Sequence, residues 1–246
     1  MIPKVIHYCW FGKSPLPELA KKCIASWRIY FPDYEIKEWN EDNFNVFTIP
    51  YTAEAYKAKK YAFVSDYARL WVLYQYGGIY FDTDVEVIKS MDDIVERGPF
   101  MGYEDEEGNV FGENSCVNPG LGLGVTPRNA IIKEILDIYK SRHLFTWDGK
   151  LMDSIVLITT DLLKKKGIIL GENGFDAFEG FTIYPKDFFC PKNYYTGKLI
   201  ITQNTRSIHH YDATWVNNTR TLWEKVKKRL TMIYYRLWGE LFVLFY

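Results

Sequence analysis

The stretch GGIYFDTDVEV, residues 77–87, constrains the fold of this chain more than any other feature. A short apolar run ends directly in two aspartates, Asp82 and Asp84. The run follows a long helical pattern over residues 53–76, which Gly77 and Gly78 terminate. A helix, a buried strand and polar residues at the strand's end are typical of α/β proteins, in which ligands collect at the carboxyl ends of strands.

The first forty residues repeat this alternation of elements. The apolar stretch 4–12 predicts a buried strand, the spacing over 18–30 predicts a helix, and 33–40 predicts a second strand. This order favours an α/β fold with a parallel sheet. Further strands are expected at 99–106 and 120–125, and further helices at 128–142 and 153–167. The stretch 181–191 predicts a strand that leads into a loop, and 206–215 predicts a last short strand and its exit.

Composition excludes several classes of protein. The chain has 246 residues, of which 48% are hydrophobic, which fits one large domain or one domain with a small appendage. A net charge of -1 gives no general attraction to nucleic acid. The four cysteines form no CxxC pair, so neither a zinc knuckle nor a redox motif is indicated. With no apolar leader at the start, we expect a cytoplasmic protein with free thiols.

The spacing of the two aspartates predicts a metal site. Side chains alternate along a strand, so Asp82 and Asp84 are expected to point the same way. Two neighbouring carboxylates favour a cation beside them, and oxygen ligands favour Mg²⁺ or Mn²⁺. One alternative is a solvated loop with two chance acids. Another is a DxD phosphatase with Asp82 as nucleophile, although Glu86 occupies a position where that class carries Thr or Val.

Asp66 and Arg69 lie three positions apart on the predicted helix 53–76, and therefore on one face of it. The residues around them are apolar. A charged pair on a largely buried helix favours a ligand-binding role, in which the guanidinium contacts a phosphate and the carboxylate accepts from sugar hydroxyls. The alternative is an ordinary ion pair on the helix surface.

These residues carry a resemblance to a known family. The chain resembles the DXD sugar-binding-region glycosyltransferases, glycosyltransferase family 32, in IPKVIHYCWFG, SDYARLWVLYQYGGIYFDTDVE and SIHHYDATW. The stretch IYPKDFFCPKNYYTGK is similar to the bacterial capsular polysaccharide branch. The resemblance covers residues 1–216 and implies a GT-A fold, which is Rossmann-like, as a catalytic domain over 1–218.

The resemblance also implies a chemistry. It implies a retaining, metal-dependent glycosyltransferase that moves a sugar from a nucleotide-sugar, with UDP favoured, to a polysaccharide or lipid-linked oligosaccharide. Asp82, Asp84, Asp66 and Arg69 would be the catalytic residues, with Mn²⁺ or Mg²⁺ on the two DXD carboxylates. The residues implied to bind the donor are Ile6, His7, Trp10, Asp66, Arg69, Gly78, Tyr80, Asp82 and Trp215. A sugar-nucleotide-binding module with little turnover is the alternative.

The resemblance further implies a late histidine as a metal ligand beside the DXD carboxylates. Two candidates are adjacent, His209 and His210. Neighbouring strand residues face opposite sides, so only one of them is expected to reach the metal. We favour His210 on strand parity, and His209 remains the alternative.

Residues 219–246 differ from the rest of the chain. They carry six basic and two acidic residues, a net charge of +4, along an apolar stripe at helical spacing. This pattern predicts a basic amphipathic C-terminal helix that binds the membrane surface, with docking on the catalytic domain or on another subunit of an oligomer as alternatives. The expected location is the cytoplasm, peripheral on the inner face of a bacterial membrane, where lipid-linked capsule acceptors lie.

Overall fold

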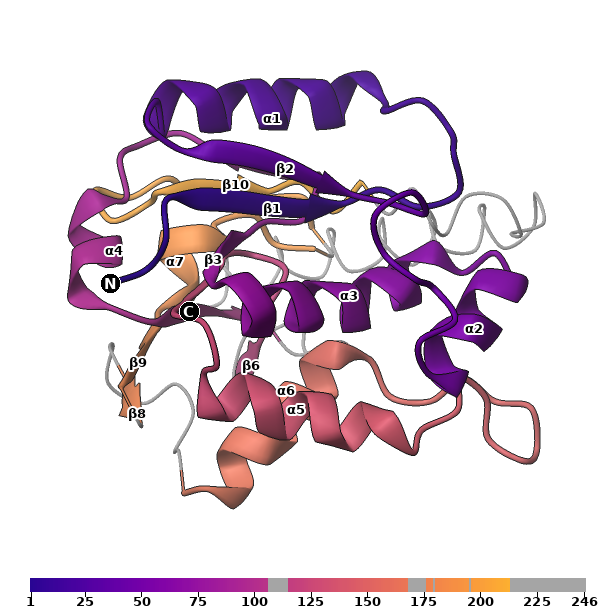
Figure 1. Ribbon diagram of the computed structural model, residues 1–246. Helices are drawn as coiled ribbons and strands as arrows, with labels where there is room; N and C mark the ends of the chain where they lie inside the picture. Colours follow the sequence, from indigo (N-terminus) through magenta and orange to yellow (C-terminus); the bar gives the residue numbers. More distant parts are fainter. Residues whose placement is uncertain (106–114, 168–175, 179, 195, 213–246) are drawn as a thin grey trace.

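The structure is a computed structural model that describes residues 1–105, 115–167, 176–178, 180–194 and 196–212. Its centre is a mixed sheet of eight strands in the order β2-β1-β3-β7-β5-β9-β8, with β6 paired to β5 (Figure 1). The strands of this sheet are β1 (Val5–Cys9), β2 (Glu35–Trp39), β3 (Gly78–Tyr80), β5 (Phe100–Asp105), β6 (Ser115–Val117), β7 (Leu123–Val125), β8 (Asp176–Phe178) and β9 (Phe181–Tyr184).

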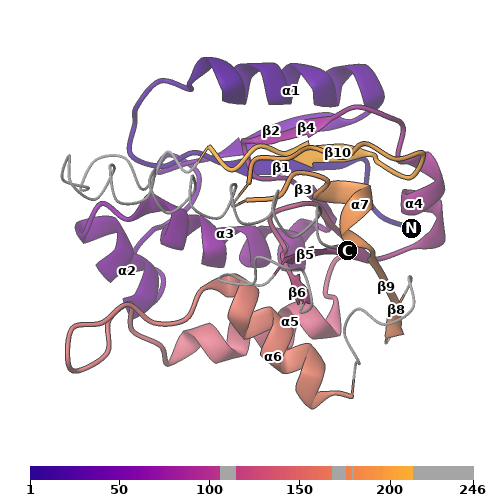
Figure 2. The same cartoon turned by 180° about the vertical axis from the view of Figure 1, so that it is seen from behind.

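Helices cover both faces of the sheet, and a small second sheet pairs β4 (Val85–Val87) with β10 (Ser207–His209). Helix α1 lies on one face and α3 with α5 on the other (Figure 1). The view from behind shows β10 near α7 and beside β4 (Figure 2). The helices are α1 (Glu18–Tyr30), α2 (Pro50–Lys57), α3 (Tyr61–Tyr76), α4 (Asp92–Arg97), α5 (Ala130–Lys140), α6 (Ile155–Lys165) and α7 (Lys186–Phe189).

Strand alternation divides the core between the two faces. Ile6 and Tyr8 of β1 belong to the cluster that contains Trp27 of α1, whereas Cys9 belongs to the cluster around α3. Trp27 is fully buried and donates a hydrogen bond from its indole nitrogen to the Val85 carbonyl at 2.8 Å. Helix α1 is therefore fixed both to the main sheet and to β4, the strand that follows the two aspartates.

The predicted helix 53–76 is two helices. Helix α2 ends at Lys57 and α3 begins at Tyr61, because Lys59 adopts a left-handed φ of 56° between them. Glycine is the usual residue in that conformation, and a lysine there leaves no sign in the sequence. The prediction of one uninterrupted helix was therefore wrong at its amino-terminal end, while the end at Gly77 is confirmed.

The sheet is parallel where the sequence predicted it and mixed beyond. Strands β2, β1 and β3 run parallel, but β7 runs antiparallel to β3. The last short strand expected within 206–215 is confirmed as β10, which pairs with β4. Among the described residues, no helix is both long and apolar enough to span a bilayer.

A buried histidine in β1 joins three elements. His7 is 1% exposed, and its Nδ1 accepts a hydrogen bond from Trp39 Nε1 at 3.0 Å. The ring proton therefore lies on Nε2, which donates to the Gly77 carbonyl at 3.0 Å. Burial lowers the pKa of His7 to about 4, so the imidazole is neutral and structural at neutral pH.

The unfolding free energy of the His7→Gln variant is expected to depend less on pH than that of the wild type. The unfolded chain takes up the His7 proton near pH 6.5 and the folded chain only near pH 4, so acid favours unfolding across that interval. The difference in pKa corresponds to about 3 kcal/mol of unfolding free energy lost between pH 7 and pH 4. Urea unfolding at both pH values should show a smaller loss in the variant; equal losses would contradict the assignment.

Candidate active site

The two aspartates lie at the edge of the sheet where the parallel strands β1, β2 and β3 end. The backbone turns sharply there, since the Val85 amide donates to the Asp82 carbonyl at 3.0 Å. The Asp82 amide in turn donates to the Gly120 carbonyl at 3.0 Å. Both side chains remain partly accessible, with 27% of the Asp82 side chain and 18% of the Asp84 side chain exposed. A ligand at this edge can therefore reach both carboxylates.

Arg69 connects the first aspartate to α3. Its Nη2 lies 3.0 Å from Asp66 Oδ1 and 3.1 Å from Asp82 Oδ1, and only 5% of its side chain is exposed. The guanidinium also lies over the Tyr80 ring, at 4.8 Å from the ring centre. The Tyr80 hydroxyl donates to Asp82 Oδ1 at 3.1 Å. The structure thus brings the predicted pair of Asp66 and Arg69 together with Tyr80 and Asp82.

The charges of this group do not cancel. Burial raises the pKa of Asp66 to about 6, although Arg69 opposes the shift. Burial also raises the pKa of Asp82, and Arg69 again opposes it. The Arg69 guanidinium stays protonated, because the facing carboxylates outweigh the cost of its burial. One guanidinium therefore pairs with two carboxylates. The remaining negative charge of this group would be stabilised by a further cation.

Gly120 makes this arrangement sterically feasible. A Cβ atom at this position would overlap the Asp82 carboxylate at Oδ2 and lie 2.9 Å from Arg69 Nη1. Any side chain would therefore displace the carboxylate from its guanidinium partner. The sequence analysis assigned no role to Gly120, and its only signal is its place in the expected strand 120–125.

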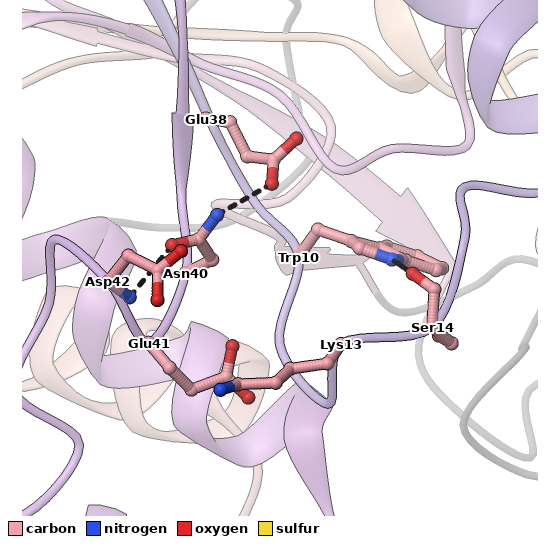
Figure 3. A pocket seen from close by; sticks show the side chains of 7 residues that line it. All are labelled: Trp10, Lys13, Ser14, Glu38, Asn40, Glu41 and Asp42. Carbon is pink, nitrogen blue, oxygen red and sulfur yellow. Dashed lines mark hydrogen bonds between the residues drawn. The ribbon is translucent and has the colours of Figure 1, made fainter.

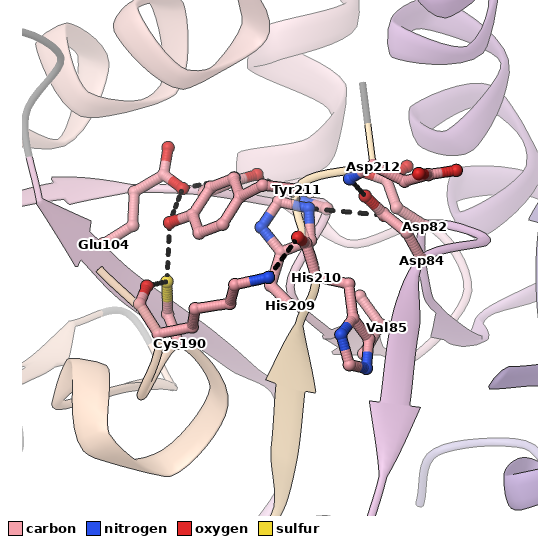
Figure 4. Close-up of polar contacts among 12 residues, drawn as sticks. Asp82, Asp84, Val85, Glu104, Cys190, His209, His210, Tyr211 and Asp212 are labelled. Carbon is pink, nitrogen blue, oxygen red and sulfur yellow. Dashed lines mark hydrogen bonds and ion pairs between the residues drawn. The ribbon is translucent and has the colours of Figure 1, made fainter. Parts of the chain in front are cut away.

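The second aspartate faces a histidine of β10. His209 Nε2 lies 3.3 Å from Asp84 Oδ1, and the Asp212 amide donates to Asp84 Oδ2 at 2.9 Å (Figure 4). Burial raises the pKa of Asp84, but His209 and hydrogen bonds from backbone amides, including that of Asp212, together lower it to about 2. Burial alone would lower the pKa of His209. Asp84 and then Cys190 oppose this effect and raise the pKa of His209 well above its usual value. Asp84 is thus a carboxylate at all working pH values.

The structure turns His210 away from this group. His210 Nε2 lies 2.8 Å from Glu86 Oε2, and Glu86 also pairs with Lys22 at 2.9 Å. The reason is the register of the short sheet, in which His209 stands opposite Val85 and Ile208 opposite Glu86. His209, the alternative in the sequence analysis, is therefore the histidine beside the DXD carboxylates, and His210 is not.

Three further residues surround His209 on the side away from Asp84. One atom each of Glu104, Cys190 and His209 lie within 4.8 Å of one another. The Tyr211 hydroxyl lies 2.8 Å from Cys190 Sγ and 3.5 Å from Glu104 Oε2 (Figure 4). The sequence analysis missed these residues. Glu104 lies within the expected strand 99–106 and Cys190 within the strand and loop expected at 181–191, which is the only signal that the sequence offered for them.

The segment that contains the two aspartates matches a known protein family. Residues 17–101 match the family model of a glycosyltransferase sugar-binding region containing a DXD motif. This segment runs from the start of α1 into β5 and contains Asp66, Arg69, Asp82 and Asp84. The match supports the family that the sequence resembles.

Two curated relatives support the same family over part of the chain. Inositol phosphoceramide mannosyltransferase 1 of Schizosaccharomyces pombe is 29% identical over 111 residues, 41% of this chain. Inositol phosphoceramide mannosyltransferase 3 of the same organism is 32% identical over 122 residues, 45% of this chain. The matched part is 33% of the length of each relative. Among solved structures, PaToxG glycosyltransferase aligns with a TM-score of 0.49 and 20% identity over 68% of this chain and 70% of that one.

The three residues predicted to bind the donor near the first strand do not lie together: two are buried in the core, and one lines a pocket. Ile6 is fully buried in the core and His7 is bonded to Trp39 and Gly77, so neither side chain faces the sheet edge. Trp10 is only partly buried and lines a pocket of about 340 Å³ (Figure 3). The residues lining this pocket are Trp10, Lys13, Ser14, Glu38, Asn40, Glu41 and Asp42.

This pocket lies beyond the carboxyl ends of β1 and β2, on the same edge of the sheet as the DXD motif. Gly78 is buried at the start of β3, where a Cβ atom would lie 2.6 Å from the Val5 carbonyl oxygen. It therefore shapes the strand pairing and offers no side chain to a ligand. Trp215 and the predicted C-terminal helix 219–246 lie outside the described residues.

The donor atoms of the DXD region fit a divalent cation. Carboxylate oxygens suit Mg²⁺ and Mn²⁺, and an imidazole nitrogen beside them favours the transition-metal ion Mn²⁺ over Mg²⁺. The His209 Nε2 and Asp84 Oδ1 atoms, 3.3 Å apart, are close enough to share one ion. The surrounding charge also favours a cation, because four carboxylates face one guanidinium and one imidazole. These groups are Asp66, Asp82, Asp84, Glu104, Arg69 and His209.

Proposed function

We propose that the protein is a metal-dependent glycosyltransferase that takes a sugar from a nucleoside diphosphate donor. The observation that carries this proposal is the convergence of Asp82, Asp84 and His209 at the sheet edge, with Arg69 behind them. The edge also holds the Trp10 pocket, which is large enough for part of a nucleotide. The family match over residues 17–101 supports the same activity.

Each residue of the candidate site has its own role in the proposed reaction. Asp82, Asp84 and His209 would hold the cation, which when bound supplies positive charge to the diphosphate as it leaves. Arg69 favours the ionised form of Asp82 against the effect of burial and holds this carboxylate in place through its ion pair at 3.1 Å. Asp66 accepts from Arg69 at 3.0 Å, and the contact to a donor sugar hydroxyl that we assign to it rests on the resemblance.

The finer assignments rest on the resemblance. They are a GT-A fold over residues 1–218, retention of anomeric configuration, and a polysaccharide or lipid-linked acceptor. A UDP-sugar is the favoured donor, while the mannosyltransferase names of the two relatives add a nucleoside diphosphate mannose. Residues 219–246, with their net charge of +4, are proposed to contact a membrane surface on the cytoplasmic side.

A panel of nucleotide-sugars that includes UDP-sugars and GDP-mannose tests the proposal. The full chain is mixed with each donor and Mn²⁺, and release of the nucleoside diphosphate is measured with and without EDTA. We expect one donor to be hydrolysed or transferred only when the metal is present. At 100 times its dissociation constant, that donor should add about 2.7 kcal/mol of stability, a rise in Tm of roughly 5–10 °C.

The outcomes of this panel separate the two candidate functions. Stabilisation without release of nucleoside diphosphate, even with sugar acceptors added, would favour a binding module. Release that EDTA does not change would remove the metal from the proposal. No stabilisation and no release with any donor would contradict the proposed activity.

A further inference from the structure

His209 has two ring nitrogens, and the proposed function uses only one of them. Nε2 faces Asp84, whereas Nδ1 lies on the side of Tyr211 and Cys190 (Figure 4). His209 is 8% exposed, and Nδ1 is buried with no hydrogen-bond partner in the part of the chain that the structure describes. A buried ring nitrogen without a partner is costly, so its surroundings should contain a group that can bond to it.

Binding a cation decides which nitrogen carries the proton. A metal takes the lone pair of a neutral imidazole, so Nε2 must be unprotonated and the proton must lie on Nδ1. That N–H points to the side where Glu104 and Cys190 offer an oxygen and a sulfur within 4.8 Å of a His209 nitrogen. Histidine ligands of metals usually donate their second N–H to such an acceptor, which fixes the tautomer.

Glu104 is the stronger of the two acceptors. A carboxylate accepts hydrogen bonds well and has two oxygens, whereas a thiol sulfur accepts weakly. Glu104 Oε2 accepts from Asn118 Nδ2 at 2.8 Å and from the Tyr211 hydroxyl at 3.5 Å, whereas Oε1 accepts no hydrogen bond from the residues that the structure describes. Cys190 Sγ lies 2.8 Å from the Tyr211 hydroxyl and so helps to hold the tyrosine.

Tyr211 keeps this group against the imidazole. Its ring centre lies 4.2 Å from that of His209. Its backbone has a φ of 57°, a strained value for a residue other than glycine. This conformation directs the following amide, that of Asp212, to Asp84 Oδ2 at 2.9 Å. The turn at Tyr211 and Asp212 therefore positions a group on each side of the His209 ring.

We propose that Glu104 is a positioning residue that accepts the Nδ1–H of His209 and holds the tautomer in which Nε2 binds the cation. This inference rests on the proposed function, since it assigns the second contact of one proposed metal ligand. Cys190 and Tyr211 hold the glutamate and the ring in place. Glu104 touches neither the donor nor the reacting atoms; it acts through His209.

Manganese affinity without any donor tests the proposal. Free Mn²⁺ is measured by electron paramagnetic resonance during titration of the wild type, Glu104→Gln and Glu104→Leu. Both variants lose the negative charge, but only Gln keeps an oxygen acceptor. We expect Leu to weaken the affinity about 10- to 100-fold relative to wild type, and Gln to recover most of that loss. Equal affinities in Gln and Leu would overturn the proposal.

Further variants separate the possible failures. If Asp84→Asn binds Mn²⁺ as well as the wild type, the metal site itself fails. If Asp84→Asn loses binding while Glu104→Leu keeps it, only the present inference fails. Cys190→Ala should change the affinity less than about threefold, because a thiol accepts weakly. A larger loss there than in Glu104→Leu would move the acceptor role to the thiol and overturn the assignment.

A direct measurement on the unchanged protein completes the test, in case Glu104→Leu does not fold. Zinc, a diamagnetic ion that binds imidazole, replaces Mn²⁺, and long-range proton–nitrogen NMR spectra report the tautomer of each of the four histidines. Loss of one signal in His209→Gln assigns His209. We expect its proton on Nδ1 in the zinc-bound protein. A proton on Nε2 with zinc present would overturn the proposal.

Discussion

Asp84→Asn is expected to lower metal-dependent release of nucleoside diphosphate at least about 100-fold. Asparagine has the same size and can still accept from the Asp212 amide, but it lacks the charge that faces His209 at 3.3 Å. Rates are measured with Mn²⁺ and the best donor of the panel, together with the Mn²⁺ affinity. We expect both the rate and the affinity to fall, while circular dichroism shows an unchanged fold.

Glu86→Gln is the matched control for this experiment. Glu86 lies two residues further along the same segment and also contacts a histidine, His210, at 2.8 Å. It faces Lys22 and α1, away from the aspartate edge. Its variant should keep the activity and the Mn²⁺ affinity of the wild type. An active Asp84→Asn, or an equal loss in Glu86→Gln, would mean that the charge at Asp84 has no special role.

Arg69→Ala is expected to destabilise the protein by about 3–5 kcal/mol, because it leaves Asp66 and Asp82 without their common partner. For a chain of this size, that loss corresponds to a fall in Tm of roughly 6–20 °C at pH 7. The deficit should shrink as the pH falls toward 5. Burial already raises the pKa of Asp66 to about 6, and removal of the guanidinium raises it further, so acid neutralises the unpaired carboxylate.

An exposed ion pair with the same spacing provides the comparison. Lys21 and Glu18 of α1 also lie three residues apart, at 2.6 Å, but their side chains are 57% and 89% exposed. Lys21→Ala should change the unfolding free energy by no more than about 1 kcal/mol. Thermal unfolding of both variants under the same conditions checks this contrast. Similar losses at the two sites would show that burial of the Arg69 group contributes little.

The elements predicted best from the sequence are those with strong local patterns. The helix at 18–30 and the strands at 4–12 and 33–40 agree with α1, β1 and β2 to within a few residues, because periodicity and turn residues act locally. The break between α2 and α3 had no such signal, since Lys59 takes a conformation that its side chain does not favour. The direction of β7 depends on tertiary pairing, which one strand's own sequence does not encode.

The residues of the candidate site also divide into those that local spacing predicted and those that depend on tertiary pairing. Asp66 with Arg69, and Asp82 with Asp84, were predicted because their spacing alone places each pair together. The choice between His209 and His210 depends on the register between β10 and β4, which three residues of strand do not reveal. Gly120 and Glu104 meet the site only through the antiparallel part of the sheet, so no local pattern identified them.

The pairing of β10 with β4 has a consequence for biosynthesis. It joins Asp84 to a turn 128 positions further along the chain, one of the most distant contacts of the described structure. The segment that matches the family model ends at residue 101, so it contains the acidic half of the site and lacks the imidazole. All strands of the main sheet precede β10 in the sequence, so a nascent polypeptide can pair those strands before His209 comes to lie beside Asp84.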